Sequence, residues 1–320
     1  MTVASGRVDQ HDVVILESAD IRVSVDVERG AHIFSIVCRE TGTEVLFQDP
    51  RGLAGHVVGG WYELFPNAGP ASGEPAVPQH GDVRSARWRV LRAQEVGDGG
   101  VLHVVTESAA LPLTISRTMT LDGRRLRVDE TIANLSDEPT PYLWGHHVTF
   151  GVEPGGETTI EVDSRDIVSL GAFAPGASIV RADAEGAGLD DLPHKDGGVA
   201  DLTRFPMEPA SEMLFARTIE RARASVVGPR LRVDLSWDER VFPALWLWIE
   251  NRGAHGEPFR GTTSGLALEP QAGYLPTLES AIRAGIAPIL APRGSVDAWI
   301  ELEVRSASTC PEVGAGVTAP

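Results

Sequence analysis

Cysteine is scarce in this chain of 320 residues, and long hydrophobic runs are absent. The two cysteines, Cys38 and Cys310, lie far apart and lack the spacing of metal ligands, so nothing in the sequence supports a disulfide and reduced thiols are expected. No stretch reaches the ~18 apolar residues of a membrane-spanning helix, and the first residues contain no apolar signal segment. We therefore expect a soluble, cytoplasmic protein that does not associate with membranes.

Basic residues are also in short supply. The chain has 28 Lys and Arg against 45 Asp and Glu, a net charge of −17. Nucleic acids and anionic membranes attract basic surfaces, so neither is expected as the main partner. The same charge disfavours a highly anionic substrate, although local arginines could override it. A small molecule is the expected partner, and the sequence leaves a homodimer open.

Helical patterns are rare, whereas short alternating segments are frequent. The 34 glycines and 22 prolines are spread along the chain, as turns between short strands require. We expect an all-β fold, a large antiparallel sandwich with few short helices, in one domain over 13–305 with flexible ends at 1–12 and 306–320. Strands are predicted at 21–27, 32–38, 86–92, 101–106, 113–121, 124–132, 142–150, 158–162, 220–227, 230–237, 244–250, 265–270 and 296–304.

Two segments fall outside this strand pattern. Residues 275–284 have apolar side chains at helical spacing, and Gly285 is placed to end a helix there. Residues 183–211 are rich in Asp, Gly and Pro. We interpret them as a long surface excursion that could form the rim or lid of a cleft.

Titratable side chains interrupt two apolar strands, PYLWGHHVTFG at 141–151 and GLALEPQAG at 265–273. The first carries His146 and His147, which point to opposite faces of a strand. The second carries Glu269. Burial of such groups costs free energy unless they are paired or hydrogen-bonded. One histidine and Glu269 are therefore candidates for an acid–base pair.

Other interpretations of these strands remain open. The histidines could be one core residue and one exposed residue, and Glu269 could face solvent at a sheet edge. A metal site is disfavoured because adjacent strand histidines rarely converge on one ion and no carboxylate is suitably spaced. No metal is expected. Trp248 shares a face with Trp246, and the two could be core residues or a platform for a sugar ring.

Residues 59–88 contain two further motifs. In GGWYELFPNAGPAS, the glycines and prolines argue against both a long helix and a central strand. The segment is either a loop anchored by aromatic residues such as Trp61 or a sugar-contacting loop in which Asn67 offers a donor and an acceptor. In VPQHGDVRSARW, His80 and Arg84 point to one side of an extended chain. A lone loop histidine is often only structural.

These motifs, in this order, resemble those of the aldose 1-epimerase (galactose mutarotase-like) family. The resemblance covers roughly residues 13–305. It includes GGWYELFPNAGP, the block that runs from His80-Gly81 through Arg84 to Trp88, HVTF at 147–150 and LEP at 268–270. It implies a β-supersandwich. It also implies catalysis by His147 and Glu269, and sugar contact by His80.

The activity implied by the resemblance is the interconversion of α and β anomers of a free sugar. The hemiacetal opens when a base removes the O1 proton while an acid protonates the ring oxygen, and no cofactor is needed. We expect Glu269 to be the base and a protonated His147 the acid, because a nearby carboxylate favours a charged imidazole. Sugar binding is expected to involve His80, Arg84, Asn67, Trp61, Trp144 and Trp248.

The sequence also departs from the family pattern. Galactose mutarotases usually carry an Asn-Arg pair where this chain reads Pro66-Asn67-Ala68, and sugar-6-phosphate mutarotases carry an arginine where it has Val58. An unphosphorylated sugar is favoured, with a sugar phosphate as the alternative. A non-catalytic sugar-binding protein on the same fold, or a lyase or glycoside-processing relative, also stays open.

Overall fold

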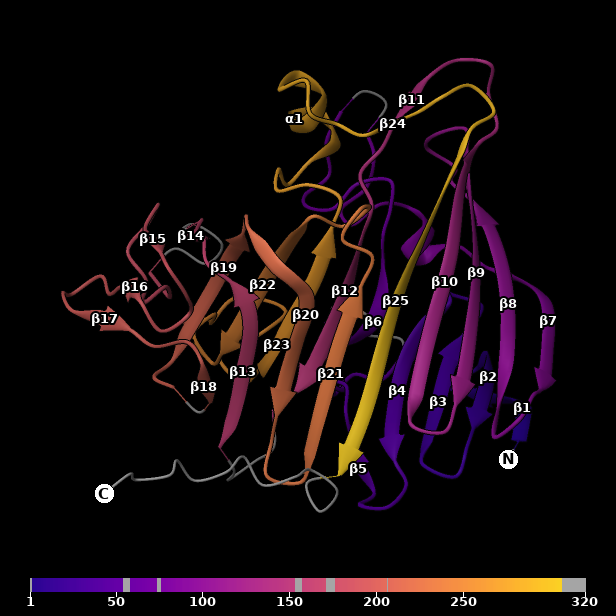
Figure 1. Cartoon of the computed structure of the whole chain (residues 1–320), viewed down its shortest axis with the longest axis horizontal. Helices are drawn as coiled ribbons and strands as arrows, with labels where there is room; N and C mark the ends of the chain where they lie inside the picture. The colour runs from indigo at the N-terminus through magenta and orange to yellow at the C-terminus, as the bar shows by residue number, and fades with distance from the viewer. Residues whose placement is uncertain are drawn as a thin grey trace, which may run out of the picture.

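Two large antiparallel sheets pack face to face in the computed structural model (Figure 1). One sheet has 12 strands and the other has nine. The structure describes residues 2–53, 58–73, 76–152, 157–170, 176–205 and 207–306. The expected all-β antiparallel sandwich is confirmed.

The strand order of the 12-stranded sheet is β1 (Thr2–Val8), β2 (His11–Glu17), β3 (Ile21–Asp26), β4 (His32–Cys38), β6 (Gly60–Leu64), β12 (Gly145–Gly151), β23 (Ser264–Gln271), β22 (Ala244–Asn251), β19 (Ala210–Ala216), β14 (Ile167–Ser169) and β15 (Glu185–Gly186), and β5 (Thr43–Glu44) pairs with β4. The nine-stranded sheet runs β18 (Arg204–Phe205), β13 (Thr158–Ser164), β20 (Ile219–Val227), β21 (Leu231–Trp237), β25 (Ser295–Ser306), β10 (Arg125–Asn134), β9 (Leu113–Asp122), β8 (Gly99–Glu107) and β7 (Arg89–Glu95). The remaining elements are β11 (Thr140–Pro141) with β24 (Ile289–Leu290), β16 (Leu192–Pro193) with β17 (Val199–Ala200), the 3₁₀ turn η1 (Val83–Ser85) and the helix α1 (Leu278–Arg283).

Period-two alternation explains how the sheets form the core. In β9, Leu113, Ile115, Arg117 and Met119 are buried, while the residues that alternate with them are partly exposed. Side chains of adjacent strand residues point to opposite faces of a sheet, so one face of β9 packs inward. It meets the inner face of the 12-stranded sheet, including Ile33 and Leu268, in one apolar cluster. This cluster fixes the relative position of the two sheets.

Loops and α1 cover the other face of the 12-stranded sheet, so its central strands are buried on both sides. Two small apolar clusters form there, one around Tyr62, Trp246 and Leu278 and the other around Val58 and Trp248. A sheet face buried by loops is a frequent place for a binding site, because the loops vary while the strands hold side chains rigidly. We refer to it as the loop-covered face.

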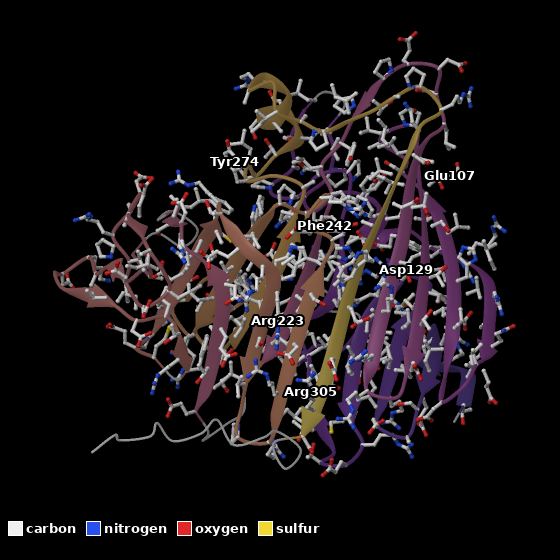
Figure 2. The ribbon with its side chains drawn as sticks, in the orientation of Figure 1. Glu107, Asp129, Arg223, Phe242, Tyr274 and Arg305 are labelled. Carbon is white, nitrogen blue, oxygen red and sulfur yellow. The ribbon has the colours of Figure 1, made fainter. Side chains whose placement is uncertain are left out.

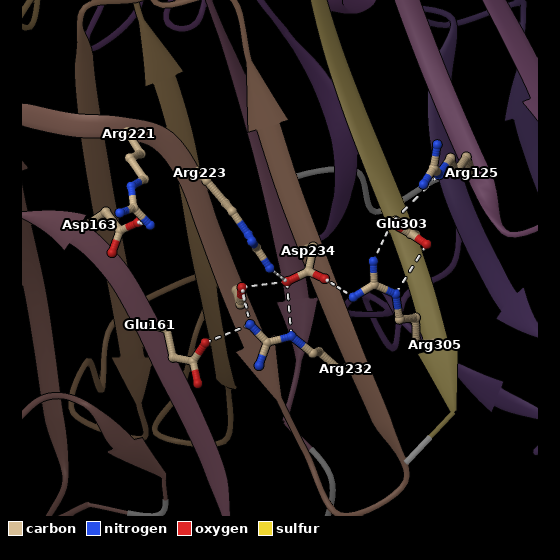
Figure 3. A network of polar contacts seen from close by, with 10 residues as sticks. Arg125, Glu161, Asp163, Arg221, Arg223, Arg232, Asp234, Glu303 and Arg305 are labelled. Atoms are coloured by element: carbon tan, nitrogen blue, oxygen red, sulfur yellow. Dashed lines mark hydrogen bonds and ion pairs between the residues drawn. The ribbon is translucent and has the colours of Figure 1, made fainter. Parts of the chain in front are cut away.

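The outward face of the nine-stranded sheet is charged. Figure 3 shows Asp234 on β21 surrounded by arginines: Arg223, Arg232 and Arg305 place guanidinium nitrogens 2.8, 3.0 and 3.0 Å from its carboxylate. In Figure 2 the labelled Arg223 and Arg305 lie along this sheet, far from Tyr274 beside α1. These ion pairs form a solvated surface network.

Several local expectations were wrong. Residues 2–8, expected to belong to a flexible end, form β1, which pairs along its length with β2. Residues 60–64 form a central strand between β4 and β12 despite the glycines at 59 and 60. The excursion 183–211 does not lie over the sheet centre. It adds β15 and β18 to sheet edges and contains the start of β19, which was not predicted.

The helix is present but shorter than predicted. Thr277 caps its first turn by accepting a hydrogen bond from the Ser280 amide, and Gly285 follows its end with φ 71°. Ile282 is 49% exposed, whereas Leu278 is buried. No described helix is long and apolar enough to cross a membrane. Ser306 ends β25, and 307–320, expected to be flexible, lies outside the described residues. So does Cys310; Cys38 is a buried free thiol.

Candidate active site

A row of side chains crosses the centre of the loop-covered face, one from each of six neighbouring strands. Register pairs Tyr62 with His147, Trp246 with Glu269, and Phe215 with Trp246. The pairs Gly145–Gln271 and Val148–Leu268 also place His147 opposite Glu269. The complete row is His32, Tyr62, His147, Glu269, Trp246 and Phe215. Because cross-strand neighbours lie about 5 Å apart, this row brings the two predicted catalytic residues together.

His147 is held from several sides. Its Nε2 lies 3.5 Å from Glu269 Oε1, and its Nδ1 lies 2.9 Å from Thr149 Oγ1. The Tyr62 ring stacks on the imidazole with centroids 4.7 Å apart and planes 10° apart. Only 7% of His147 is exposed. Burial lowers its pKa well below the ordinary value, and His80, Arg84 and His32 lower it further.

Glu269 is 3% exposed, and burial raises its pKa to about 8. Gln271 Nε2 lies 3.5 Å from its Oε2 and opposes this shift only weakly. At neutral pH the carboxyl is therefore protonated and the imidazole of His147 neutral. This reverses the expected protonation of the pair: the cost of burying two charges exceeds their attraction at 3.5 Å.

Two glycines make room for polar side chains beside the row. Gly60 has φ 71°, and a Cβ on it would overlap the His32 imidazole. A Cβ on Gly145 would overlap the carboxamide of Gln271. These contacts explain the glycines before Trp61 and before His146: without side chains there, His32 and Gln271 can lie flat against the sheet.

The loop after β6 brings His80 and Arg84 to the same place. The His80 Nδ1 lies 2.6 Å from the Ala68 carbonyl, and its ring centroid lies 5.9 Å from that of His147. Burial lowers the pKa of His80 to about 4, with Arg84 as the second cause. The Arg84 guanidinium lies 4.2 Å above the Tyr62 ring. In the neutral His80, Nδ1 donates to Ala68 and Nε2 is the acceptor, which lies 3.2 Å from the Gln79 carboxamide nitrogen.

Three predicted sugar contacts are wrong. Trp61 is fully buried between the sheets, where its indole N–H donates to His146 Nδ1 at 3.0 Å. Trp144 is also fully buried and donates to Glu63 Oε2 at 3.0 Å. Asn67 donates to three loop carbonyls and accepts from the Leu278 amide at 2.8 Å, which leaves no free donor. Both indoles follow the inward parity of their strands, so they belong to the core.

The sixth predicted contact, Trp248, does lie at the site. Its ring centroid is 6.1 Å from that of His147, and it packs against Phe259 at 5.6 Å. Register places Ala267, Thr149 and Gly60 next to Trp248, in a second row on the same face. These small residues form a low floor beside the row that contains His147 and Glu269.

A charged cluster beneath the site was not predicted. His146 points inward, as the strand alternation required, and lies 3.1 Å from Glu63 and 3.0 Å from Glu130. Arg117 donates to Glu63 and, at 2.6 Å, to Glu130. We call Glu63, Arg117, Glu130 and His146 the buried quartet. Each of its residues is at most 4% exposed.

Burial and the neighbouring charges shift the pKa values of the quartet in different directions. Burial raises the pKa of Glu63 well above its ordinary value, with Glu130 adding to the effect. His146 and Arg117 outweigh burial and hold the pKa of Glu130 at about 2. Burial lowers the pKa of His146. Glu63, Glu130 and His146 each offer one potential metal-ligand atom, and these three atoms lie within 4.8 Å of one another. Arg117, however, already places a fixed cation against both carboxyl groups.

Comparison with known proteins identifies the architecture. No family description and no curated protein matches the sequence. Solved structures do match over most of both chains. A galactose mutarotase-like protein from Clostridium acetobutylicum is 14% identical with a TM-score of 0.71, over 96% of this chain and 99% of its own. This chain has the galactose mutarotase-like fold.

Two further structures agree with this assignment. A galactose mutarotase-like protein from Lactobacillus casei is 19% identical, with a TM-score of 0.63 over 92% of this chain and 100% of its own. The Slr1438 protein from Synechocystis sp. PCC 6803 is 21% identical, with a TM-score of 0.70 over 95% and 96% of the two chains. The resemblance inferred from the sequence blocks is thus confirmed at the level of the galactose mutarotase-like fold.

On this galactose mutarotase-like fold, two hollows adjoin the row. The Tyr62 hollow, about 160 Å³, is lined by Arg29, His32, Gly59, Tyr62, Pro78, Gln79, Gly81, Arg84 and Ser85. The Phe47 hollow, about 120 Å³, shares His32 and Gly59 with it and includes Phe34, Phe47 and Gln48. Neither hollow is lined by His147 or Glu269, which lie beside them behind Tyr62 and Trp248.

A larger hollow of about 310 Å³ lies on the other sheet. Its carboxylates are already engaged: Asp297 accepts from Thr131 at 2.6 Å, and Asp238 from Arg240 at 2.7 Å. Asp129 accepts from Arg127 at 2.9 Å. This hollow offers no titratable pair for proton transfer, so the candidate active site is the row on the loop-covered face.

The raised pKa of Glu269 makes stability depend on pH. Its folded pKa of about 8 exceeds the ordinary 4.5, so the folded state binds the extra proton and stability falls as pH rises from about 5 through 8. Between pH 5 and pH 9, we expect the unfolding free energy of wild type to fall by on the order of 3 kcal/mol more than that of Glu269→Gln, which lacks the titrating carboxyl. Urea unfolding at both pH values measures the difference. The exposed Glu279→Gln is the control; equal pH dependence in wild type and Glu269→Gln would contradict the burial argument.

Proposed function

We propose that this protein is an aldose 1-epimerase, an isomerase that interconverts the α and β anomers of a sugar by ring opening. The observation that carries the proposal is the pairing of His147 with Glu269 at 3.5 Å on adjacent strands of the loop-covered face. The reaction needs one acid and one base that exchange roles, and this pair supplies both. The fold shared with galactose mutarotase-like proteins supports the same activity.

The pair holds one transferable proton. Glu269 carries it in the free protein, because burial raises the pKa of Glu269 and lowers that of His147. Neutral His147 removes the O1 proton while the Glu269 carboxyl protonates the ring oxygen, and the C1–O5 bond breaks. After rotation about C1–C2, O5 attacks the other carbonyl face; His147 returns its proton to O1 and Glu269 recovers its own from O5. No electrons are lost and no group leaves the sugar.

The surrounding residues bind the sugar around this pair. His80 Nε2 accepts from a sugar hydroxyl that takes the place of the Gln79 carboxamide, and the Arg84 guanidinium over Tyr62 donates to an oxygen. Trp248 supplies an apolar wall 6.1 Å from His147. The sugar lies along the low floor of Gly60, Thr149 and Ala267. Fixed donors in a dry site stabilise developing charge better than water does.

The direct test is magnetisation-exchange NMR of anomer interconversion, carried out on purified protein with a panel of aldoses. We expect at least one aldose to exchange faster than in buffer alone, in proportion to enzyme concentration. If no aldose shows this acceleration although calorimetry detects sugar binding, the protein is a non-catalytic sugar-binding protein.

The pH profile tests the assignment of protons. The active form of the free enzyme carries one proton on the pair, so kcat/KM should be flat near neutrality and fall as Glu269 deprotonates at about pH 8. On the acid side it should fall only well below pH 6.5, because the pKa of His147 is lowered. Exchange rates between about pH 4 and 10 measure both limbs. A rate that rises through pH 8 would contradict protonated Glu269 as the acid.

A sugar phosphate is the second candidate substrate. Arg29 and Arg84 both line the Tyr62 hollow, and their proximity contributes, after burial, to lowering the pKa of Arg29. Two guanidinium groups in one hollow suit an anionic substituent. Exchange rates for glucose and glucose 6-phosphate distinguish the candidates, and Arg29→Gln should reduce only the rate for the phosphate.

A further inference from the structure

The Phe47 hollow has the side chains of a carbohydrate subsite but lies beside the catalytic row, not on it. Phe34 and Phe47 are half-buried and line it, together with Gln48. Gln48 donates from Nε2 to the Phe34 carbonyl at 2.8 Å, which leaves its carboxamide oxygen as an acceptor. Aromatic faces with a few fixed polar groups are typical of sites that bind sugar rings.

This hollow adjoins the active site on two sides. It shares His32 and Gly59 with the Tyr62 hollow. On the other side, Phe47 and Val58 pack in one cluster with Trp248, whose ring lies 6.1 Å from His147. A ligand held at His147 could therefore extend into the Phe47 hollow without leaving the loop-covered face.

An unpartnered donor adjoins both places, because Trp248 packs in one cluster with Phe47 and its ring lies 6.1 Å from that of His147. The Trp248 indole N–H is buried and has no hydrogen-bond partner in the part of the chain that the structure describes, although the residue is only 4% exposed. Trp246, on the same face, donates its N–H to the Gly273 carbonyl at 2.9 Å. A buried donor without an acceptor costs about 1–3 kcal/mol, so its persistence in a cluster at the site favours an acceptor brought by a ligand.

We propose that the Phe47 hollow is a subsite for a second sugar ring, so that the enzyme acts on the reducing end of a saccharide longer than one ring. The inference rests on the proposed epimerase function. Anomer exchange needs a free C1 only on the terminal ring, so a neighbouring ring attached elsewhere does not interfere with the chemistry. The terminal ring contacts His147 and Glu269, Trp248 donates to it or to the linkage, and the next ring packs on Phe47.

The experiment compares exchange of monosaccharides and reducing disaccharides. Exchange NMR on wild type with glucose, galactose, maltose, cellobiose and lactose gives kcat/KM for each. We expect at least one disaccharide to be favoured over its own monosaccharide by about tenfold, the factor that about 1.4 kcal/mol gives. Phe47→Ala should remove this advantage while changing the monosaccharide value by less than about twofold.

The monosaccharide rate of Phe47→Ala shows that the variant is folded, and Tyr274→Ala is the matched control because Tyr274 is 46% exposed away from the hollow. The subsite would be overturned, and the epimerase function left standing, by either of two results. One is an equal loss of kcat/KM in Phe47→Ala for monosaccharides and disaccharides; the other is a wild type with no preference for a disaccharide. If wild type exchanges no sugar, the epimerase function fails, and calorimetric titration decides the subsite separately. Tighter disaccharide than monosaccharide binding that Phe47→Ala abolishes supports it, and equal affinities overturn it.

Discussion

Glu269→Gln is expected to lower kcat for anomer exchange by about three orders of magnitude, within the ~10²–10⁴-fold that a positioned proton transfer contributes. Glutamine has the same shape and keeps the contact with Gln271, but it cannot protonate the ring oxygen. His147→Asn should cause a similar loss, because asparagine can still bond to Thr149 but cannot accept the O1 proton. Sugar affinity should change by only a few-fold in either variant, since the other contacts remain. Exchange NMR gives kcat, and calorimetry gives affinity.

The double variant makes this prediction sharper. Because ring opening needs both proton transfers, loss of either partner removes the same pathway, and Glu269→Gln with His147→Asn should be about as slow as each single variant. Multiplicative losses would mean that the two residues act independently. Glu279→Gln, on the exposed helix α1, should keep the wild-type rate. A Glu269→Gln or His147→Asn protein with wild-type turnover would refute the assigned chemistry.

The sequence predicted the architecture and the meeting of His147 with Glu269, because both depend on strand alternation. Apolar periodicity located most strands of both sheets. The motifs HVTF and LEP placed His147 and Glu269 on strands, and the register then had only to bring two cross-strand neighbours together. Residues 60–64 were misjudged because glycine usually weakens a strand, whereas here Gly60 is required by the His32 ring that lies on it.

The protonation of the pair depends on covering loops that the sequence did not locate. The expectation of a charged His147 came from ordinary pKa values and a nearby carboxylate. The loop-covered face excludes so much water that burial lowers the pKa of His147 and raises that of Glu269. Trp61 and Trp144 were assigned to the sugar for a related reason. An aromatic side chain suits either face of a strand, so these residues alone did not show which face packs in the core.

The buried quartet did leave a signal that was not used. Arg117 falls in phase with Ile115 and Met119 in β9, and Glu130 falls in phase with Val128 and Ile132 in β10. A charge at an inward position of an alternating strand indicates a buried partner. Opposite charges on two strands joined by a tight hairpin indicate that they pair with each other, which register confirms.

Arg117→Met is expected to destabilise the fold by about 3–5 kcal/mol, the cost of removing one partner of a buried ion pair. Arg117 contacts Glu63 and Glu130 and donates to the Ala31 carbonyl at 3.0 Å, so it joins the nine-stranded sheet to the 12-stranded sheet beneath the active site. Methionine fills similar volume but leaves Glu130 without its cation. Urea unfolding at pH 7 measures the loss. Arg221→Met, at a side chain that is 81% exposed, should cost less than about 1 kcal/mol.

The pH dependence of the Arg117→Met loss separates charge from packing. Without the guanidinium, the pKa of Glu130 should rise from about 2, because only His146 is left to oppose burial. The loss of stability should then grow as pH rises from about 4 to 8, because the folded state has lost part of what stabilised the ionised carboxyl. Adding Glu130→Gln removes that charge, so the double variant should recover part of the loss at pH 8 and little at pH 4. A loss equal at both pH values and unaffected by Glu130→Gln would assign Arg117 a packing role only.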